Sequence, residues 1–249
     1  MTRRYGILFG LAMALLTGCQ AGPHPGLAAL KVTARAEPKQ GVPMQSSEVG
    51  VYDRPASSHY GGGGGAFEKV DYASLANIVV WIQPAGATPT TMPAGAPPGP
   101  PVRIDVGDKP SGDDKVIGAG VGQQLIFVNR TARAMTIYSV SDGNDFDLGR
   151  VPPGGERNYV VHSPGLIEVL TDSSDQPLAR VYAAPNSHVA VTHSGGEVTF
   201  NDLPPGQYRV LSWHPRLPGS EATVDLRPNQ VQSMTITVGV NALPKEYPK

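Results

Sequence analysis

Short runs of β-branched and aromatic residues recur between residues 78 and 238 and are separated by glycine and proline turns. Residues 78–82 form one continuous apolar run with the composition of a buried strand. Residues 139–141 and 158–162 partly alternate apolar with polar side chains, which is typical of a sheet with one face in water. No segment repeats its apolar residues with the period of a helix, so the pattern predicts an all-β protein of one or two sandwiches. The expected strands are residues 78–82, 102–106, 124–128, 135–140, 158–162, 166–170, 179–183, 188–192, 197–201, 208–213, 222–226 and 233–238.

The first nineteen residues have the layout of a bacterial lipoprotein signal. Two arginines precede an apolar core at residues 5–16, which is too short for the roughly 20 residues of a spanning helix. Leu16-Thr17-Gly18-Cys19 then resembles the lipobox, at which bacterial signal peptidase II cuts. An ordinary signal peptide with a chance cysteine is the alternative. We expect residues 1–18 to be removed and Cys19 to carry acyl chains, of which two or three give a stable membrane anchor.

Residues 19–66 lack sustained periodicity, and residues 61–65 are all glycine. This composition predicts a disordered, flexible tether between the lipid and a folded part that begins near Phe67. A glycine run can also cradle a phosphate, but this one lacks the GK[ST] ending and the strand-to-helix context of a P-loop. Gln20, rather than an aspartate, follows the cysteine. That choice favours the outer membrane over the inner one, with the protein facing the periplasm.

Composition narrows the possible partners. Charged residues make up 16% of the chain and the formal net charge is −1, so no basic surface for nucleic acid is predicted. Cys19 is the single cysteine. The folded part of this exported protein therefore contains no disulfide and depends on its hydrophobic core for stability.

Several pieces of residues 75–240 resemble the cupredoxin-like proteins labelled methylamine-utilisation proteins. The resemblance implies a cupredoxin-like Greek-key β-sandwich at residues 67–182 and a smaller, carboxypeptidase-regulatory-like β-sandwich at residues 183–240, followed by a tail at residues 241–249. Residues 183–240 are few for a complete module, so the strand at residues 78–82 is also a candidate member of the second sandwich, with the cupredoxin part inserted between. The pieces are Ile78-Val79-Val80-Trp81, Phe127-Val128-Asn129-Arg130, Phe146-Asp147-Leu148-Gly149, Pro153-Gly154-Gly155-Glu156, Ser163-Pro164-Gly165, Leu203-Pro204-Pro205-Gly206-Gln207-Tyr208 and Trp213-His214-Pro215.

The same resemblance implies a copper protein, and the ligand positions can be checked. A blue-copper site uses two imidazoles and one thiolate, with a weak axial thioether. By the spacing of the family, the four ligand positions fall on Met135, Thr171, Ser174 and Pro177. All four are substituted, and the only thiol, at Cys19, is committed to lipid. We therefore expect no type-1 copper, no other resident metal and no cofactor.

The histidines offer a weaker metal candidate. His188 and His193 are five residues apart around a predicted strand end. Together with Asp172, Asp175 or Asp202 they are candidates for weak Zn²⁺ or Cu²⁺ binding, although exposed loop histidines are the simpler interpretation. We expect His162 at the surface, and we expect His214 to cap a strand end by a hydrogen bond.

Catalytic and calcium motifs are incomplete. Asp142, Asn144, Asp145 and Asp147 form an acidic loop, but it lacks the twelve-residue spacing and the final bidentate glutamate of a calcium loop. No G-x-S-x-G elbow occurs, and nothing orders a Ser/His/Asp triad. The chain is therefore predicted not to be an enzyme.

The leading hypothesis is a membrane-anchored, non-catalytic binding or structural module, whose partner is an envelope protein or a glycan. One alternative is periplasmic electron transfer or copper handling at a non-blue site, which requires Met135, His188 or His193 to converge. A second alternative is a carbohydrate-binding module, which requires exposed aromatic side chains. The tyrosines in predicted strands are instead expected to be packed; they are Tyr138, Tyr159, Tyr182 and Tyr208.

Overall fold

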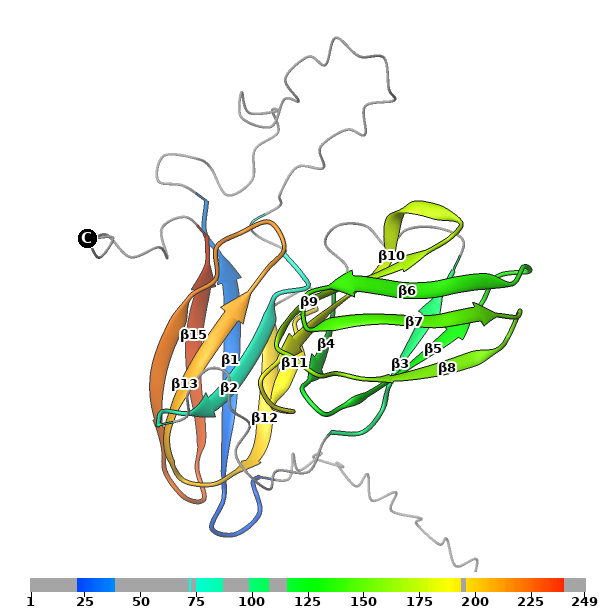
Figure 1. Ribbon diagram of the computed structural model, residues 1–249. Coiled ribbons are helices and arrows are strands. Elements are labelled where there is room, and N and C mark those ends of the chain that lie inside the picture. The colour runs from blue at the N-terminus through cyan, green and yellow to red at the C-terminus, as the bar shows by residue number, and fades with distance from the viewer. Residues whose placement is uncertain are drawn as a thin grey trace, which may run out of the picture.

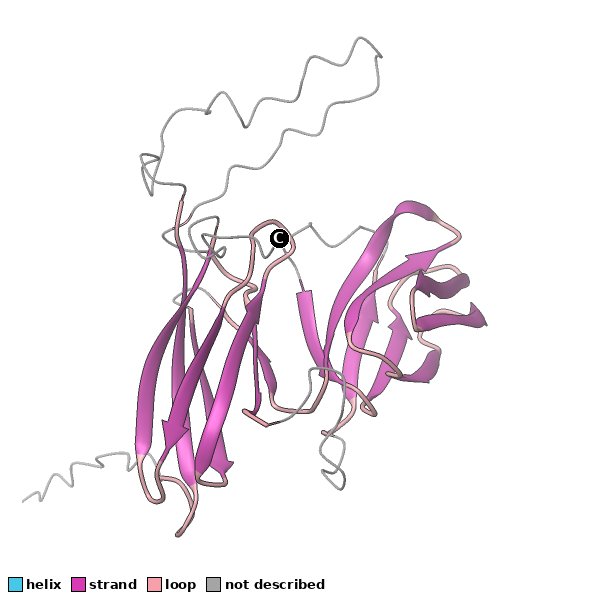
Figure 2. Cartoon of the chain, turned by 60° about the vertical axis from the view of Figure 1, so that its left-hand side comes forward, coloured by secondary structure: helices cyan, strands magenta, loops and turns pink. Residues whose placement is uncertain are grey.

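The computed structural model describes residues 22–38, 72, 75–86, 99–107, 116–193 and 196–239. Within these ranges every regular element is a strand, as predicted (Figure 2). The described part of the chain holds no helix long and apolar enough to cross a bilayer. The predicted signal peptide, Cys19, the glycine run and the tail at residues 241–249 lie outside the described residues.

In the described ranges fifteen strands build four sheets, which pair into two sandwiches that lie side by side (Figure 1). The strands are β1 (Ala28–Ala36), β2 (Val79–Pro84), β3 (Val102–Val106), β4 (Val116–Gly120), β5 (Gln124–Asn129), β6 (Met135–Ser141), β7 (Asn144–Val151), β8 (Glu156–Val160), β9 (Gly165–Thr171), β10 (Ser174–Ala184), β11 (Val189–Val191), β12 (Glu197–Leu203), β13 (Gly206–Trp213), β14 (Glu221–Leu226) and β15 (Val231–Val238). One sandwich, here called the inserted sandwich, comprises β3 to β10. The other, called the terminal sandwich, comprises β1, β2 and β11 to β15.

The terminal sandwich contains β1, which corrects the prediction of a tether over residues 19–66. This strand lies between β12, antiparallel, and β15, parallel. Its apolar residues alternate, so Leu30, Val32 and Ala34 enter the core while Lys31 and Thr33 face outward. The alternation is hard to recognise in the sequence because alanines, which are poor strand formers, supply part of it. The folded part therefore already includes residues 28–36, well before Phe67.

The other sheet of the terminal sandwich has the order β11-β2-β13-β14. Strand β2 pairs antiparallel with β13, from Tyr208 opposite Pro84 to Trp213 opposite Val79. The predicted boundaries put residues 78–82 in the cupredoxin part, at 67–182, and the structure corrects this. The structure places these residues in the terminal sandwich, which is the alternative that the shortness of residues 183–240 suggested. Strands β3 to β10 are inserted between β2 and β11.

The inserted sandwich packs the sheet β3-β5-β8 against the sheet β4-β10-β9-β6-β7. Its core includes the fully buried Leu125, Phe127, Ile137 and Ile167, which come from both sheets. Strand β3 runs parallel to β5, and β4 runs parallel to β10, so the chain crosses between the sheets. Strands β4 and β7 were not expected from the sequence.

An aromatic contact joins the two sandwiches. The Tyr182 ring lies 5.2 Å from the Trp81 ring and 4.6 Å from the Trp213 ring, measured between centroids. Burial among these rings raises the pKa of Tyr182 to about 12. Beside them β4 contacts β11, and a methyl group added at Gly118 would lie 3.1 Å from the side chain of Val191. The sandwiches are thus held together by close apolar packing.

Candidate functional site

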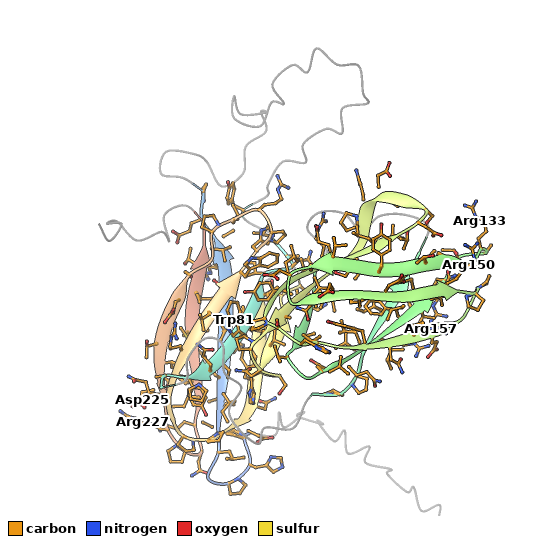
Figure 3. All side chains as sticks on the ribbon, in the orientation of Figure 1. Trp81, Arg133, Arg150, Arg157, Asp225 and Arg227 are labelled. Carbon is orange, nitrogen blue, oxygen red and sulfur yellow. The ribbon has the colours of Figure 1, made fainter. Side chains whose placement is uncertain are left out.

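An open pocket of about 400 Å³ lies at one end of the inserted sandwich. The loop after β5, the start of β6, the end of β7 and the β9–β10 turn each contribute to it. Figure 3 shows Arg133 and Arg150 at this end of the molecule, far from the terminal sandwich. The residues that line the pocket are Thr131, Arg133, Ala134, Met135, Arg150, Asp172 and Ser173.

Asn129 holds the loop that forms one wall of the pocket. Its side chain is fully buried, and its Nδ2 donates to the carbonyl oxygens of Arg133, at 2.7 Å, and of Val151, at 2.9 Å. Its Oδ1 accepts from the backbone N–H of Thr131 at 2.9 Å and from the Thr131 hydroxyl at 2.7 Å. One amide thus satisfies four polar groups and fixes the backbone from which Arg133 projects.

The charges at the pocket are mostly positive. Asp172 accepts hydrogen bonds from the backbone N–H and the hydroxyl of Thr136, at 3.1 and 3.3 Å. Arg150 lies 3.6 Å from the same carboxylate. The exposed Arg133 has no acidic partner within the described residues. Two arginines and one aspartate therefore line the pocket.

The four substituted ligand positions all lie near this end. Met135 is 3% exposed and packs in the core, where it forms part of the pocket floor. Thr171 and Ser174 face each other across a two-residue turn between β9 and β10. Their hydroxyls bond within the hairpin, to Ser173 and to the Gln176 backbone respectively. Pro177 follows, half-buried, in the irregular part of β10. Together these positions supply a thioether and two hydroxyls, without imidazole or thiolate.

The residues of the histidine-based metal hypothesis do not converge. Met135 lies at the end of the inserted sandwich where β10 begins, whereas His188 follows the other end of β10. The eleven residues of that strand span on the order of 30 Å. Burial lowers the pKa of His188, which favours its neutral form. Within the described ranges no group of three or more His, Cys, Asp and Glu side chains is placed to hold a metal ion.

The other two histidines follow the sequence prediction. His162 is exposed and stacks on Tyr159, with 5.4 Å between the ring centroids. His214 is buried just after β13, and its Nδ1 accepts from the backbone N–H of Arg216 at 3.2 Å. It therefore caps the strand end, as expected.

The side chains of the acidic loop make hydrogen bonds to the backbone. Asn144 is 1% exposed; its Nδ2 donates to the carbonyl oxygen of Ser163, and its Oδ1 accepts from the backbone N–H of His162. Asp147 accepts from the backbone N–H of Gly149, whose φ of 67° favours glycine. The Asn144 hydrogen bonds join the β6–β7 hairpin to the turn before β9.

The tyrosines are packed rather than displayed as a platform. Tyr208 is 8% exposed, and its hydroxyl donates to the carbonyl oxygen of Pro204. Tyr182 lies in the aromatic contact described above. Tyr159 packs in a tilted arrangement against Phe146 and stacks on His162. Tyr138 is half-buried in β6.

Arg133 and Arg150 were not singled out from the sequence. They are distant along the chain, and they meet because β6 pairs with β7, with Thr136 opposite Arg150 and Met135 opposite Val151. The only available signal was the position of Arg133 two residues before a predicted ligand position. That signal becomes informative only once the register of the hairpin is known.

Two solved cupredoxin structures have a low similarity to part of this chain. No protein-family model matches the chain, and no curated protein matches it. A novel purple cupredoxin from Nitrosopumilus maritimus shares 13% identity at a TM-score of 0.27, over 33% of this chain and 99% of its own. A single-substitution mutant of amicyanin in the Cu(I) form shares 15% identity at a TM-score of 0.27, over 42% of this chain and 97% of its own. The chain has a distant structural similarity to cupredoxins over part of its length.

Proposed function

We propose that this chain is a non-catalytic binding module of the bacterial cell envelope, anchored to a membrane by lipid on Cys19. In this proposal the inserted sandwich is a cupredoxin of the methylamine-utilisation type without its copper site, and the terminal sandwich is the regulatory-like module that carries it. The observation that carries the proposal is the arginine-lined pocket at the end of the inserted sandwich. Met135, one of the positions at which the resemblance implies a copper ligand, lines it.

The chemistry of the pocket favours an anionic group. A guanidinium presents a planar fork of donors that matches a carboxylate. Arg133 is available for such a contact, and Arg150 shares Asp172 at the long distance of 3.6 Å, which leaves it other donors. Ala134 and Met135 add an apolar floor. A carboxylate carried by an envelope protein or a glycan fits this combination.

The binding proposal can be tested by calorimetry on soluble protein that begins at Gln20, with hexaglutamate as the probe and hexaglutamine as the neutral control. We expect hexaglutamate alone to bind, and we expect added salt to weaken the binding because the pocket is open to solvent. The double change Arg133→Gln, Arg150→Gln should weaken it about tenfold or more, which corresponds to about 1.4 kcal/mol. Arg227→Gln, in the terminal sandwich, is the matched control (Figure 3). Equal affinity of the double variant and the wild type would refute the assignment of this pocket.

The anchor is tested separately. Cells that produce the full chain are grown with labelled fatty acid, and the protein is isolated. Because of the signal sequence, we expect the wild type to incorporate the labelled fatty acid and Cys19→Ala to lose it. Label that persists in Cys19→Ala would show that the lipid, if any, is attached elsewhere.

A further inference from the structure

The folded part starts very close to the proposed lipid anchor. The described chain begins at Gly22, three residues after Cys19. A chain segment of any conformation reaches at most about 3.5 Å per residue, so the Cα atoms of Cys19 and Gly22 are within about 10 Å of each other. If Cys19 carries lipid, Gly22 is held near the bilayer surface.

Residues 22–27 are fastened to one end of the terminal sandwich. The backbone N–H of His24 donates to Asp202 Oδ1 at 2.9 Å, and the His24 ring approaches the same oxygen at 2.8 Å. These bonds hold the pKa of the Asp202 carboxyl below its usual value. Gly26 N–H donates to Asn229 Oδ1 at 2.7 Å, and Asn229 N–H donates to the Leu27 carbonyl oxygen at 2.6 Å. A lipid on Cys19 would therefore be connected to this end of the sandwich by a short, hydrogen-bonded segment.

This end, which we call the proximal end, includes three loops with few charges, and the described residues at the end of β2 also lie there. The loops are residues 22–27, 203–206 and 227–230, which precede β1, join β12 to β13 and join β14 to β15. Besides Asp202, the charged side chains here are Asp225 and Arg227, which lie together in Figure 3. Exposed prolines and the 57% exposed Val231 add apolar surface. The exposed prolines are Pro25, Pro204, Pro205 and Pro228.

Glu37, Asn77 and Val238 lie at the opposite, distal end of the sandwich. Strand β1 has nine residues, so it carries the chain about 26 Å away from the proximal end. At the distal end the Glu37 N–H donates to the carbonyl oxygen of Val238, and the Asn77 N–H donates to that of Thr192. Residues 39–71, with the glycine run, connect two segments that both lie at this end, as does the end of β15 (Figure 1). Along the chain the glycine run follows β1, so it does not separate Cys19 from the first strand.

We propose that the proximal end of the terminal sandwich rests on the bilayer surface, so that the protein sits directly on its membrane instead of standing on a tether. This inference rests on the proposed anchor at Cys19. The partner surface is a phospholipid headgroup layer, which the low charge of the proximal end does not repel and which its exposed prolines and Val231 can contact. In this orientation Glu37, Asn77 and Val238, at the distal end, lie on the side away from the membrane.

The test uses energy transfer from single fluorophores to acceptors on lipid headgroups. Full-length acylated protein is reconstituted into vesicles of phosphatidylethanolamine and phosphatidylglycerol. The dye is attached at Pro228→Cys, at the proximal end, or at Glu37→Cys, at the distal end. Cys19 does not react in the acylated protein because its sulfur carries lipid. We expect strong transfer from position 228 and weak transfer from position 37. Equal transfer from the two positions in acylated protein would overturn the inference and leave the anchor intact.

A spacer variant provides the matched control. Twelve Gly and Ser residues inserted between Ala21 and Gly22 give a flexible linker with a root-mean-square length of about 19 Å. We expect transfer at Pro228→Cys to fall several-fold in this variant, toward the value at Glu37→Cys, while acylation is unchanged. Unchanged transfer would contradict a contact set by the short anchor. Fatty-acid label is measured in the same preparations, and its absence would overturn the anchor itself rather than the orientation alone.

Discussion

Replacement of Asn129 by alanine tests the idea that one buried amide organises the pocket. The change removes four hydrogen bonds, three of them at buried positions, and leaves the carbonyl oxygen of Val151 and the N–H of Thr131 without this partner. A net hydrogen bond contributes about 0.5–1.5 kcal/mol, and a buried group left unpaired costs about 1–3 kcal/mol. We expect a loss of about 3–4 kcal/mol in the free energy of unfolding of the inserted sandwich.

The assay is unfolding in urea, in which amide hydrogen exchange of β5 to β7 serves as the readout. Both tryptophans, Trp81 and Trp213, are in the terminal sandwich and contact Tyr182 of the inserted one, so their fluorescence does not report on the inserted sandwich alone. With a slope of about 2 kcal/mol per molar urea, the midpoint should fall by about 1.5–2 M. Asn158→Ala, at an exposed position of β8, is the control and should shift it little. A loss below about 1 kcal/mol for Asn129→Ala would refute the reasoning, because it would mean that water replaces the amide.

Two further predictions concern the terminal sandwich and the contact between the sandwiches. Leu30→Ala should destabilise the terminal sandwich by about 3 kcal/mol, because Leu30 is fully buried, and tryptophan fluorescence in urea measures this. The control Lys31→Ala removes an exposed ion pair with Glu197 and should cost less than about 1 kcal/mol; equal effects of the two changes would argue that β1 is not part of the core. Tyr182→Phe should reduce the alkaline pH dependence of unfolding. The folded pKa of Tyr182 is raised to about 12, so the stability linked to its neutral form is complete below the ordinary pKa near 10 and is lost as the pH rises toward 12. Identical losses in the variant and the wild type between pH 10 and pH 12 would contradict the burial of Tyr182.

The sequence is informative where strands are rich in β-branched residues. Residues 102–106 were expected to be a strand, and β3 has the same bounds. Strand β1 is not predicted by local sequence because four of its nine residues are alanine, and because its neighbours β12 and β15 come from the far end of the chain. Strand β4 contains two glycines in five residues, and it forms by pairing with β10. Local propensity is weak in both strands, and long-range pairing decides their structure.

The candidate site could be predicted only in part. The resemblance directed attention to Met135 and Thr171, and both lie near the pocket. Of the arginines that give the pocket its charge, Arg133 precedes β6 and Arg150 lies in β7, so both reach the pocket only through the register of the β6–β7 hairpin. The hydrogen bonds of Asn129 likewise depend on where the Val151 carbonyl oxygen lies in space.

The central claim is that this end of the inserted sandwich binds anions and does not hold copper. The most direct test titrates soluble protein that begins at Gln20 with Cu(I), Cu(II) and Zn(II) by calorimetry, beside the titration with hexaglutamate. The account predicts no stoichiometric metal binding tighter than about 1 µM, which corresponds to about 8 kcal/mol, together with salt-sensitive binding of hexaglutamate. One-to-one copper binding tighter than this, lost in Met135→Ala, would contradict the account.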